Sequence, residues 1–215
     1  YLDLRGFGPT AFVGAAYTSA LSLLTGTEAL ILDLRRNGGG EPESVAYLLS
    51  HFFPDGDSRH LNSIYHRPKD TTRQYWTVAV GVHYAKPVFV LISPRTFSGG
   101  EECAYDFQTQ KRATLVGEVS GGGANPGEDF SLGHHCMAFI PTGRAINPVT
   151  HTNWEHVGVK PDVAVPAAEA LKVAHGSILK DLIAKEKDPE QREELAMILA
   201  RGEKGETKVP DYRRR

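Results

Sequence analysis

The stretch Ala29-Leu-Ile-Leu-Asp-Leu-Arg-Arg-Asn-Gly-Gly-Gly40 is a nearly continuous apolar run that ends in three glycines. Such a run is typical of a strand buried on both faces, as in a parallel sheet. Before it, residues 1–5 alternate apolar and polar, which favours a half-buried strand, and residues 10–24 place apolar side chains at helical spacing. The order strand, helix, strand predicts a right-handed crossover unit.

The rest of the chain continues this alternation. We expect helices at 41–53, 99–111, 167–185 and 189–202, and strands at 75–80, 88–92, 113–117, 137–140 and 144–146. Gly176 is a place where the third of these helices could be split. The fold class is therefore α/β with a helical C-terminal extension. We place a main domain at 1–185 and, at 186–215, a helix followed by a flexible charged tail that begins at 203.

Composition excludes several classes of protein. The 215 residues are 40% hydrophobic and 23% charged with a net charge of −2, which is an ordinary globular balance with no general attraction to nucleic acid. No apolar run approaches the roughly 18 residues that span a bilayer, so we expect no membrane span. The two cysteines form no C-x-x-C pair, and His134-His-Cys136 has poor spacing for a zinc site, so no metal is expected. The chain starts at Tyr1 rather than Met, which is typical of a fragment or a processed chain.

The segment Thr96-Phe-Ser-Gly-Gly-Glu101 is the first place where chemistry is expected. Ser98 lies between a buried strand and the start of a helix, a position that exposes its hydroxyl beside the N–H groups of Gly99 and Gly100. Those groups could hold the oxyanion of an acyl-transfer intermediate. Judged by position alone, a helix N-cap is the simpler interpretation of Ser98. The segment does not match G-x-S-x-G, which disfavours an α/β-hydrolase.

Two further segments could complete such a site. Asn37-Gly-Gly-Gly40 also joins a buried strand to a helix, and its glycines allow a substrate backbone to come close. It lacks the lysine of a phosphate-binding loop, and a tight turn is the alternative interpretation. Asn153-Trp-Glu-His-Val-Gly-Val159 carries little information alone, and its simplest interpretation is a surface loop.

Together, these segments and their order resemble the catalytic domain of the tail-specific, or C-terminal processing, serine peptidases. Leu115-Val-Gly-Glu118 and Gly158-Val-Lys-Pro-Asp162 add to the likeness, which covers about residues 1–185. Within that family the sequence looks closest to the branch of the tricorn protease core and the interphotoreceptor retinoid-binding protein modules. The resemblance implies the ββα spiral that Clp protease and crotonase share.

The resemblance also implies roles for individual residues. Ser98 matches the nucleophile, Gly99 supplies one oxyanion donor, and Gly38 or Gly39 supplies the other. Bacterial members use a lysine about 25 residues after the serine, but no lysine lies between Lys111 and Lys160. The tricorn-like branch uses an upstream histidine oriented by a glutamate, and Glu155 matches that glutamate. The histidine would then precede Tyr1. No cofactor is implied.

The function that follows is hydrolysis of a peptide or protein substrate by a serine peptidase. The first alternative is a non-catalytic module that binds a hydrophobic small ligand, a retinoid or a fatty acid, as the retinoid-binding relatives do. A crotonase-like acyl-CoA enzyme fits less well, because it does not require Ser98. A homo-oligomer stays open, and the resemblance points to an exported protein, periplasmic or extracellular.

Overall fold

A parallel sheet forms the centre of the molecule, in a computed structural model that describes residues 1–205. Its strands are β1 (Leu2–Asp3), β2 (Leu30–Asp33), β5 (Val88–Ile92), β6 (Thr114–Gly117) and β10 (Val163–Ala164). They follow one another across the sheet in the order β1-β2-β5-β6-β10, and every pair is parallel. The expected α/β fold and the buried strands are confirmed.

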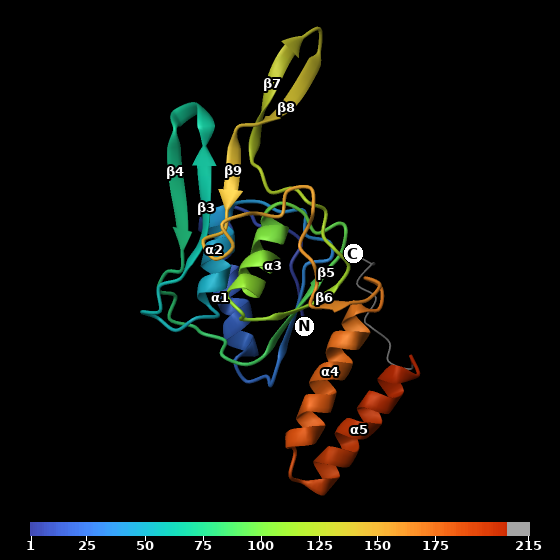
Figure 1. Cartoon of the computed structure of the whole chain (residues 1–215). Helices are drawn as coiled ribbons and strands as arrows, with labels where there is room; N and C mark the ends of the chain where they lie inside the picture. Colours follow the sequence, from blue (N-terminus) through green and yellow to red (C-terminus); the bar gives the residue numbers. More distant parts are fainter. Residues whose placement is uncertain (206–215) are drawn as a thin grey trace.

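Helices cover both faces of this sheet (Figure 1). The main core lies against one face and contains side chains from α1 (Thr10–Leu24), α2 (Pro42–Ser50) and α3 (Gly99–Thr109). A smaller core on the opposite face joins Ile31, Leu91 and Val116 to the helix α4 (Ala170–Lys185). Alternate residues of one strand thus enter different cores, which explains why the strands are apolar throughout.

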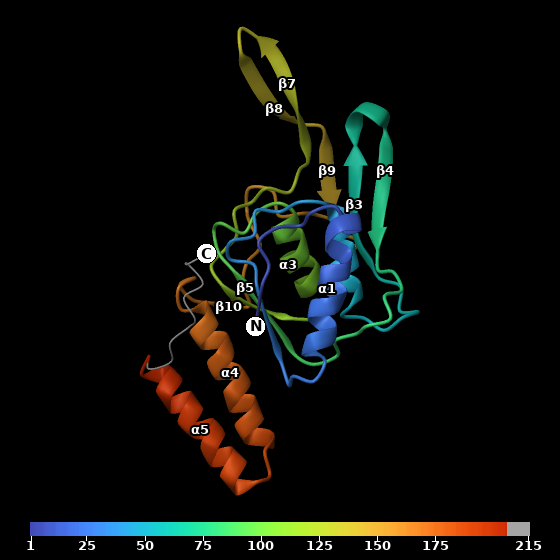
Figure 2. The ribbon, with the colours of Figure 1, turned by 180° about the vertical axis from the view of Figure 1, so that it is seen from behind.

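The C-terminal extension is a pair of helices, α4 and α5 (Pro189–Glu203), which lie side by side and project from the body (Figure 2). Asp188 caps α5 by accepting hydrogen bonds from the N–H groups of Glu190 and Gln191. Gly176 does not split α4, and the expectation of a break there was wrong. A Cβ on Gly176 would lie 3.7 Å from Leu199 Cδ1, so this glycine faces α5. The charged tail falls at 206–215, outside the described residues, and the proposed domain boundary stays a prediction.

Two antiparallel units rise from the same side of the body (Figure 1). One is a three-stranded sheet in the order β4-β3-β9, with β3 at His60–His66, β4 at Thr71–Trp76 and β9 at Gly143–Ile146; a short 3-10 turn, Arg67–Lys69, joins β3 to β4. The other is a hairpin of β7 (Gly127–Gly133) and β8 (Cys136–Pro141). The sequence did not predict β3 or β7. The strand expected at 75–80 was wrong in its bounds, because the ladder with β3 covers residues 71–76.

Candidate active site

The loops after β2 and β5 meet at the carboxyl edge of the parallel sheet. Thr96 Oγ1 donates to the Leu34 carbonyl at 2.8 Å, and Ser93 Oγ donates to the Arg35 carbonyl at 2.6 Å. The Phe97 N–H donates to the Asn37 carbonyl at 2.9 Å. Because ligands of open α/β sheets bind beyond the carboxyl ends of the strands, this is where a site is expected.

Ser98 occupies the N-cap position of α3 in an unusual backbone conformation. Its φ is 52° and its ψ is −122°, a region that residues with a side chain rarely adopt. The residue is half-buried, while Gly99 and Gly100 behind it are buried. Strain of this kind costs on the order of 1–3 kcal/mol and is concentrated at functional sites. The helix-cap interpretation accounts for the position of Ser98 but not for this conformation.

The glycine loop packs directly against Ser98. A Cβ on Gly39 would lie 2.7 Å from Ser98 Cβ and 2.8 Å from the Gly99 nitrogen, so only glycine fits there. The Gly39 N–H already donates to Asn37 Oδ1 at 2.8 Å. Among the described hydrogen bonds, the N–H groups of Gly38 and Gly99 have no acceptor. The structure thus packs Gly39 against Ser98 and Gly99, with Gly38 as the preceding residue of the same loop.

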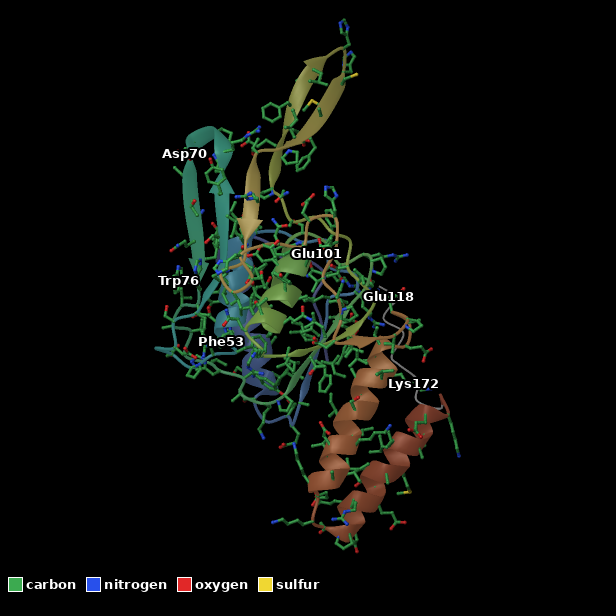
Figure 3. All side chains as sticks on the ribbon, in the orientation of Figure 1. Phe53, Asp70, Trp76, Glu101, Glu118 and Lys172 are labelled. Carbon is green, nitrogen blue, oxygen red and sulfur yellow. The ribbon has the colours of Figure 1, made fainter. Side chains whose placement is uncertain are left out.

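The Glu101 side chain fixes the turn that carries Ser98 to the glycine-rich segment 120–123. Its carboxylate is fully buried and accepts hydrogen bonds from the N–H groups of Ser98, Gly122 and Gly123 and from Ser120 Oγ, at 2.5–2.9 Å. Figure 3 shows Glu101 at the end of α3 that faces the hairpins. From the sequence, no role was expected for Glu101. The spacing Ser-x-x-Glu at a helix start, which is the capping-box pattern, was the signal that could have found it.

Glu155 lies at the other end of the glycine-rich segment. Its Oε2 accepts hydrogen bonds from the N–H groups of Ala124 and Asn125, both at 2.8 Å. Residues 122–125 therefore run from the Glu101 carboxylate to the Glu155 carboxylate. The side chain of His156 lies 3.7 Å from Glu155 Oε1, but it is 89% exposed. Glu155 and Glu101 therefore hold neighbouring residues of one segment, and Glu101 also accepts a hydrogen bond from the Ser98 N–H. The other oxygen of Glu155, Oε1, accepts no hydrogen bond from the described residues.

The side chain of Phe97 lies against two glycines of the segment 120–123. Gly123 stands 25 residues after Ser98, and a Cβ there would lie 2.1 Å from Phe97 Cζ. A Cβ on Gly121 would lie 2.7 Å from Phe97 Cδ2. A side chain at either position would therefore have to displace this ring, which is 47% exposed and has room to turn toward solvent.

No histidine among residues 1–205 is hydrogen-bonded to Ser98. His51 is fully buried, but its Nε2 lies 2.9 Å from Thr18 Oγ1 and its Nδ1 lies 3.0 Å from the Tyr47 carbonyl. Burial lowers the pKa of His51, which keeps the ring neutral at physiological pH. The ring of His60 stacks on Trp76 with centroids 4.4 Å apart. These histidines have structural roles away from the serine.

Two more carboxyl groups are buried on α3, one and five residues beyond Glu101. Burial raises the pKa of Glu102 to about 7 against the opposing effect of Asn62, and it raises the pKa of Asp106 well above its usual range. Asn147 Nδ2 donates to Asp106 Oδ1 at 3.2 Å. Burial thus favours the protonated form of both carboxyls, and no hydrogen bond in the described residues joins either of them to Ser98.

The sequence matches a known family of peptidases over most of its length. The family model described as "Peptidase family S41" matches residues 1–165. The chain belongs to peptidase family S41. "Carboxyl-terminal-processing peptidase 2, chloroplastic" of Arabidopsis thaliana is 30% identical over 176 residues, which cover 77% of this chain and 32% of that protein. The "Carboxyl-terminal-processing protease" of Synechocystis is 26% identical over 165 residues, 77% of this chain and 37% of that protein.

Solved structures of S41 peptidases have the same fold. The photosystem II D1 C-terminal processing protease aligns with a TM-score of 0.62 at 24% identity, over 77% of this chain and 42% of that one. Mature CPAF aligns with a TM-score of 0.65 at 14% identity, over 78% of this chain and 47% of that one. The S41 member described here spans about a third of the length of the curated relatives that it matches. No helix within residues 1–205 is long and apolar enough to cross a membrane.

Proposed function

We propose that this chain carries the nucleophile of a serine endopeptidase of the C-terminal processing type. The observation that carries the proposal is the conformation of Ser98, a non-glycine residue held at φ 52° beside two free glycine amides. In the reaction, Ser98 Oγ attacks the peptide carbonyl carbon and its proton passes to a base. The base then protonates the leaving amine as the C–N bond breaks, and water hydrolyses the acyl-enzyme.

The oxyanion of the tetrahedral intermediate is assigned to the N–H groups of Gly38 and Gly99. The Gly39 N–H already donates a hydrogen bond to Asn37 Oδ1, so Gly38 is favoured over Gly39 as the second oxyanion donor. Gly99 is also the first residue of α3, so the positive end of the helix dipole adds to its donor strength. In other serine hydrolases one such donor is worth about 3–4 kcal/mol of transition-state stabilisation.

Glu155 is proposed to orient the base that takes the proton of Ser98. That base is proposed to be a histidine that does not belong to residues 1–205. Glu155 Oε2 is fixed by two backbone amides, and Oε1 is left to accept a hydrogen bond. Position 123 carries a glycine and therefore no base. The tricorn-like branch and an exported location stay predictions. One relative, the Arabidopsis protein, is named as chloroplastic.

A hydrophobic-ligand carrier finds no support in the described cavities. Of two open pockets, of about 210 and 280 Å³, the first has a lining that is half polar and the second a lining that is mostly polar. Carriers of retinoids or fatty acids need an apolar cavity of at least comparable size. A peptide or protein substrate is therefore the proposed partner.

The test is labelling of the full natural protein with a fluorophosphonate probe, with the adduct mapped by mass spectrometry. We expect an adduct on Ser98 that disappears in Ser98→Ala and persists in Ser131→Ala, a change at an exposed serine of the β7–β8 hairpin. Cleavage of a fluorogenic unstructured peptide should be lost in Ser98→Ala alone. Absence of both labelling and cleavage, with Ser98 accessible, would overturn the proposal.

A further inference from the structure

The pocket of about 280 Å³ lies beside β9, on the side of the body from which the hairpins rise (Figure 1). Its walls are residues 144–146 of β9, the loop 151–153, and Asn125 from the glycine-rich segment. Arg144 is the one permanently charged side chain among them. The established parts of the site do not use this pocket.

The walls of the pocket are held rigidly by hydrogen bonds. Asn153 Nδ2 donates to Asn125 Oδ1 at 3.2 Å and to the Ala145 carbonyl at 2.7 Å, which joins all three walls. The Asn147 N–H donates to the Thr152 carbonyl, and Asn147 Oδ1 accepts from the Val149 N–H, both at 2.9 Å. A ligand would therefore meet a preformed surface and would not have to order a loop.

Arg144 is exposed and forms no ion pair with any residue in the range 1–205. It lies opposite Tyr65 in the β3–β9 ladder, but the Tyr65 hydroxyl donates to Asp70. The guanidinium has five N–H donors in a planar fork that matches a carboxylate. Its donors are thus left for a group from outside the protein.

The pocket is within reach of a peptide bound at Ser98. Both the Ser98 and the Gly123 nitrogens donate to the same oxygen, Glu101 Oε2, at 2.9 and 2.8 Å, which places them within about 6 Å of each other. Asn125 is two residues further, at most about 8 Å along the chain. An extended peptide advances about 3.3 Å per residue. The Asn125 wall of the pocket therefore lies within about four extended substrate residues of Ser98.

We propose that Arg144 binds a carboxylate of the peptide substrate in this pocket and thereby selects among substrates. The proposal rests on the proposed peptidase function and names part of its substrate specificity. The carboxylate comes either from an acidic side chain or from the free C-terminus of the peptide. Both present the same two oxygens to the guanidinium, so the experiment has to separate them.

The experiment uses the full natural protein with Ser98→Ala, so that peptides bind without being cut, and fluorescence anisotropy of labelled alanine-rich octapeptides. One set carries a single Glu or Gln at each position in turn with an amidated C-terminus; a second set is neutral with a free or an amidated C-terminus. We expect one position, or the free end, to raise affinity about tenfold, as a charge-assisted bidentate pair does. In Arg144→Gln this preference should fall to about one.

Matched variants sharpen the outcome. Arg144→Glu should reverse the preference, so that a Lys-containing peptide binds more tightly than the Glu peptide. Arg201→Gln removes an exposed arginine on α5 and should leave every ratio unchanged. Equal affinities for all peptides, or a preference that survives Arg144→Gln, would overturn the proposal for Arg144. Cleavage of the neutral peptide by the unmutated protein would show that the peptidase function itself still stands; its absence would be the failure of that function instead.

Discussion

The turn that carries Ser98 and the β7–β8 hairpin differ in how they are held. In the turn, hydrogen bonds to Leu34, Arg35, Asn37 and Glu101 fix the backbone. The hairpin is held mainly by the hydrogen bonds between β7 and β8, and its Phe139 side chain is 61% exposed. The position of a reactive group is thus set by buried polar contacts with distant loops, and not by local sequence alone.

The largest effect should come from breaking the turn at Glu101. Glu101→Ala leaves three buried N–H groups without an acceptor, and each such group costs about 1–3 kcal/mol. We expect a loss of about 4 kcal/mol in the free energy of unfolding, measured by urea denaturation. Glu190→Ala, at an exposed position of α5, should change it by less than about 0.5 kcal/mol. Equal, small effects would mean that Glu101 does not hold the turn.

Next in size is Gly40→Ala in the glycine loop. The added Cβ would lie 1.9 Å from the Phe7 carbonyl oxygen, and φ is +137°, so the backbone has to move. We expect a loss of about 3 kcal/mol in stability by thermal or urea unfolding. Gly56→Ala, also at positive φ but with nothing within 4 Å, isolates the backbone cost at about 1 kcal/mol. If the two variants lost the same stability, close packing at Gly40 would not be the cause.

A smaller effect should depend on pH, through Glu102. Because burial raises its pKa from 4.5 to about 7, the folded state disfavours ionisation. Its destabilising effect is absent below about pH 4.5, grows between pH 4.5 and 7, and is constant above. Glu102→Gln should therefore gain stability relative to the unmutated protein as pH rises from 5 to 8, by about 2 kcal/mol. Urea unfolding of both proteins at these pH values measures the difference in their free energies of unfolding. A difference that does not change with pH would contradict the prediction.

The smallest effect should come from the hairpin. Phe139→Ser removes a ring that is mostly in solvent, so we expect a change of less than about 0.5 kcal/mol in stability. Phe107→Ser, at a fully buried position in the main core, should cost more than about 3 kcal/mol. Thermal unfolding of the two variants compares them directly. A large loss of stability in Phe139→Ser would contradict the prediction, because it would mean that the Phe139 ring is buried in the folded protein.

The sequence predicted the parallel sheet well, because its signals are local. The helix Thr10–Leu24 and the strand Val88–Ile92 have the expected bounds, set by apolar spacing and by proline and glycine at their ends. It missed β3, where Asn62 and Ser63 are buried polar residues inside a strand. Burial of those side chains depends on packing against α3 and β9, which no local pattern encodes.

The candidate site was predicted in its parts but not in its connections. Ser98, Gly39 and Gly99 meet as expected because strands of a parallel sheet end at a common edge. The role of Glu101 was missed because it depends on residues 120–123, which lie about twenty positions away in the chain. The proposed roles of Gly38 and Glu155 stay predictions.

The ring of Phe97 couples two positions that are far apart in the sequence. A side chain at position 123 would displace the ring, which is 47% exposed and can turn toward solvent, and a smaller residue at 97 would leave the glycines at 121 and 123 uncovered. The cost of a side chain at 123 therefore depends on the residue at 97, and the effects of changing both residues should not simply add.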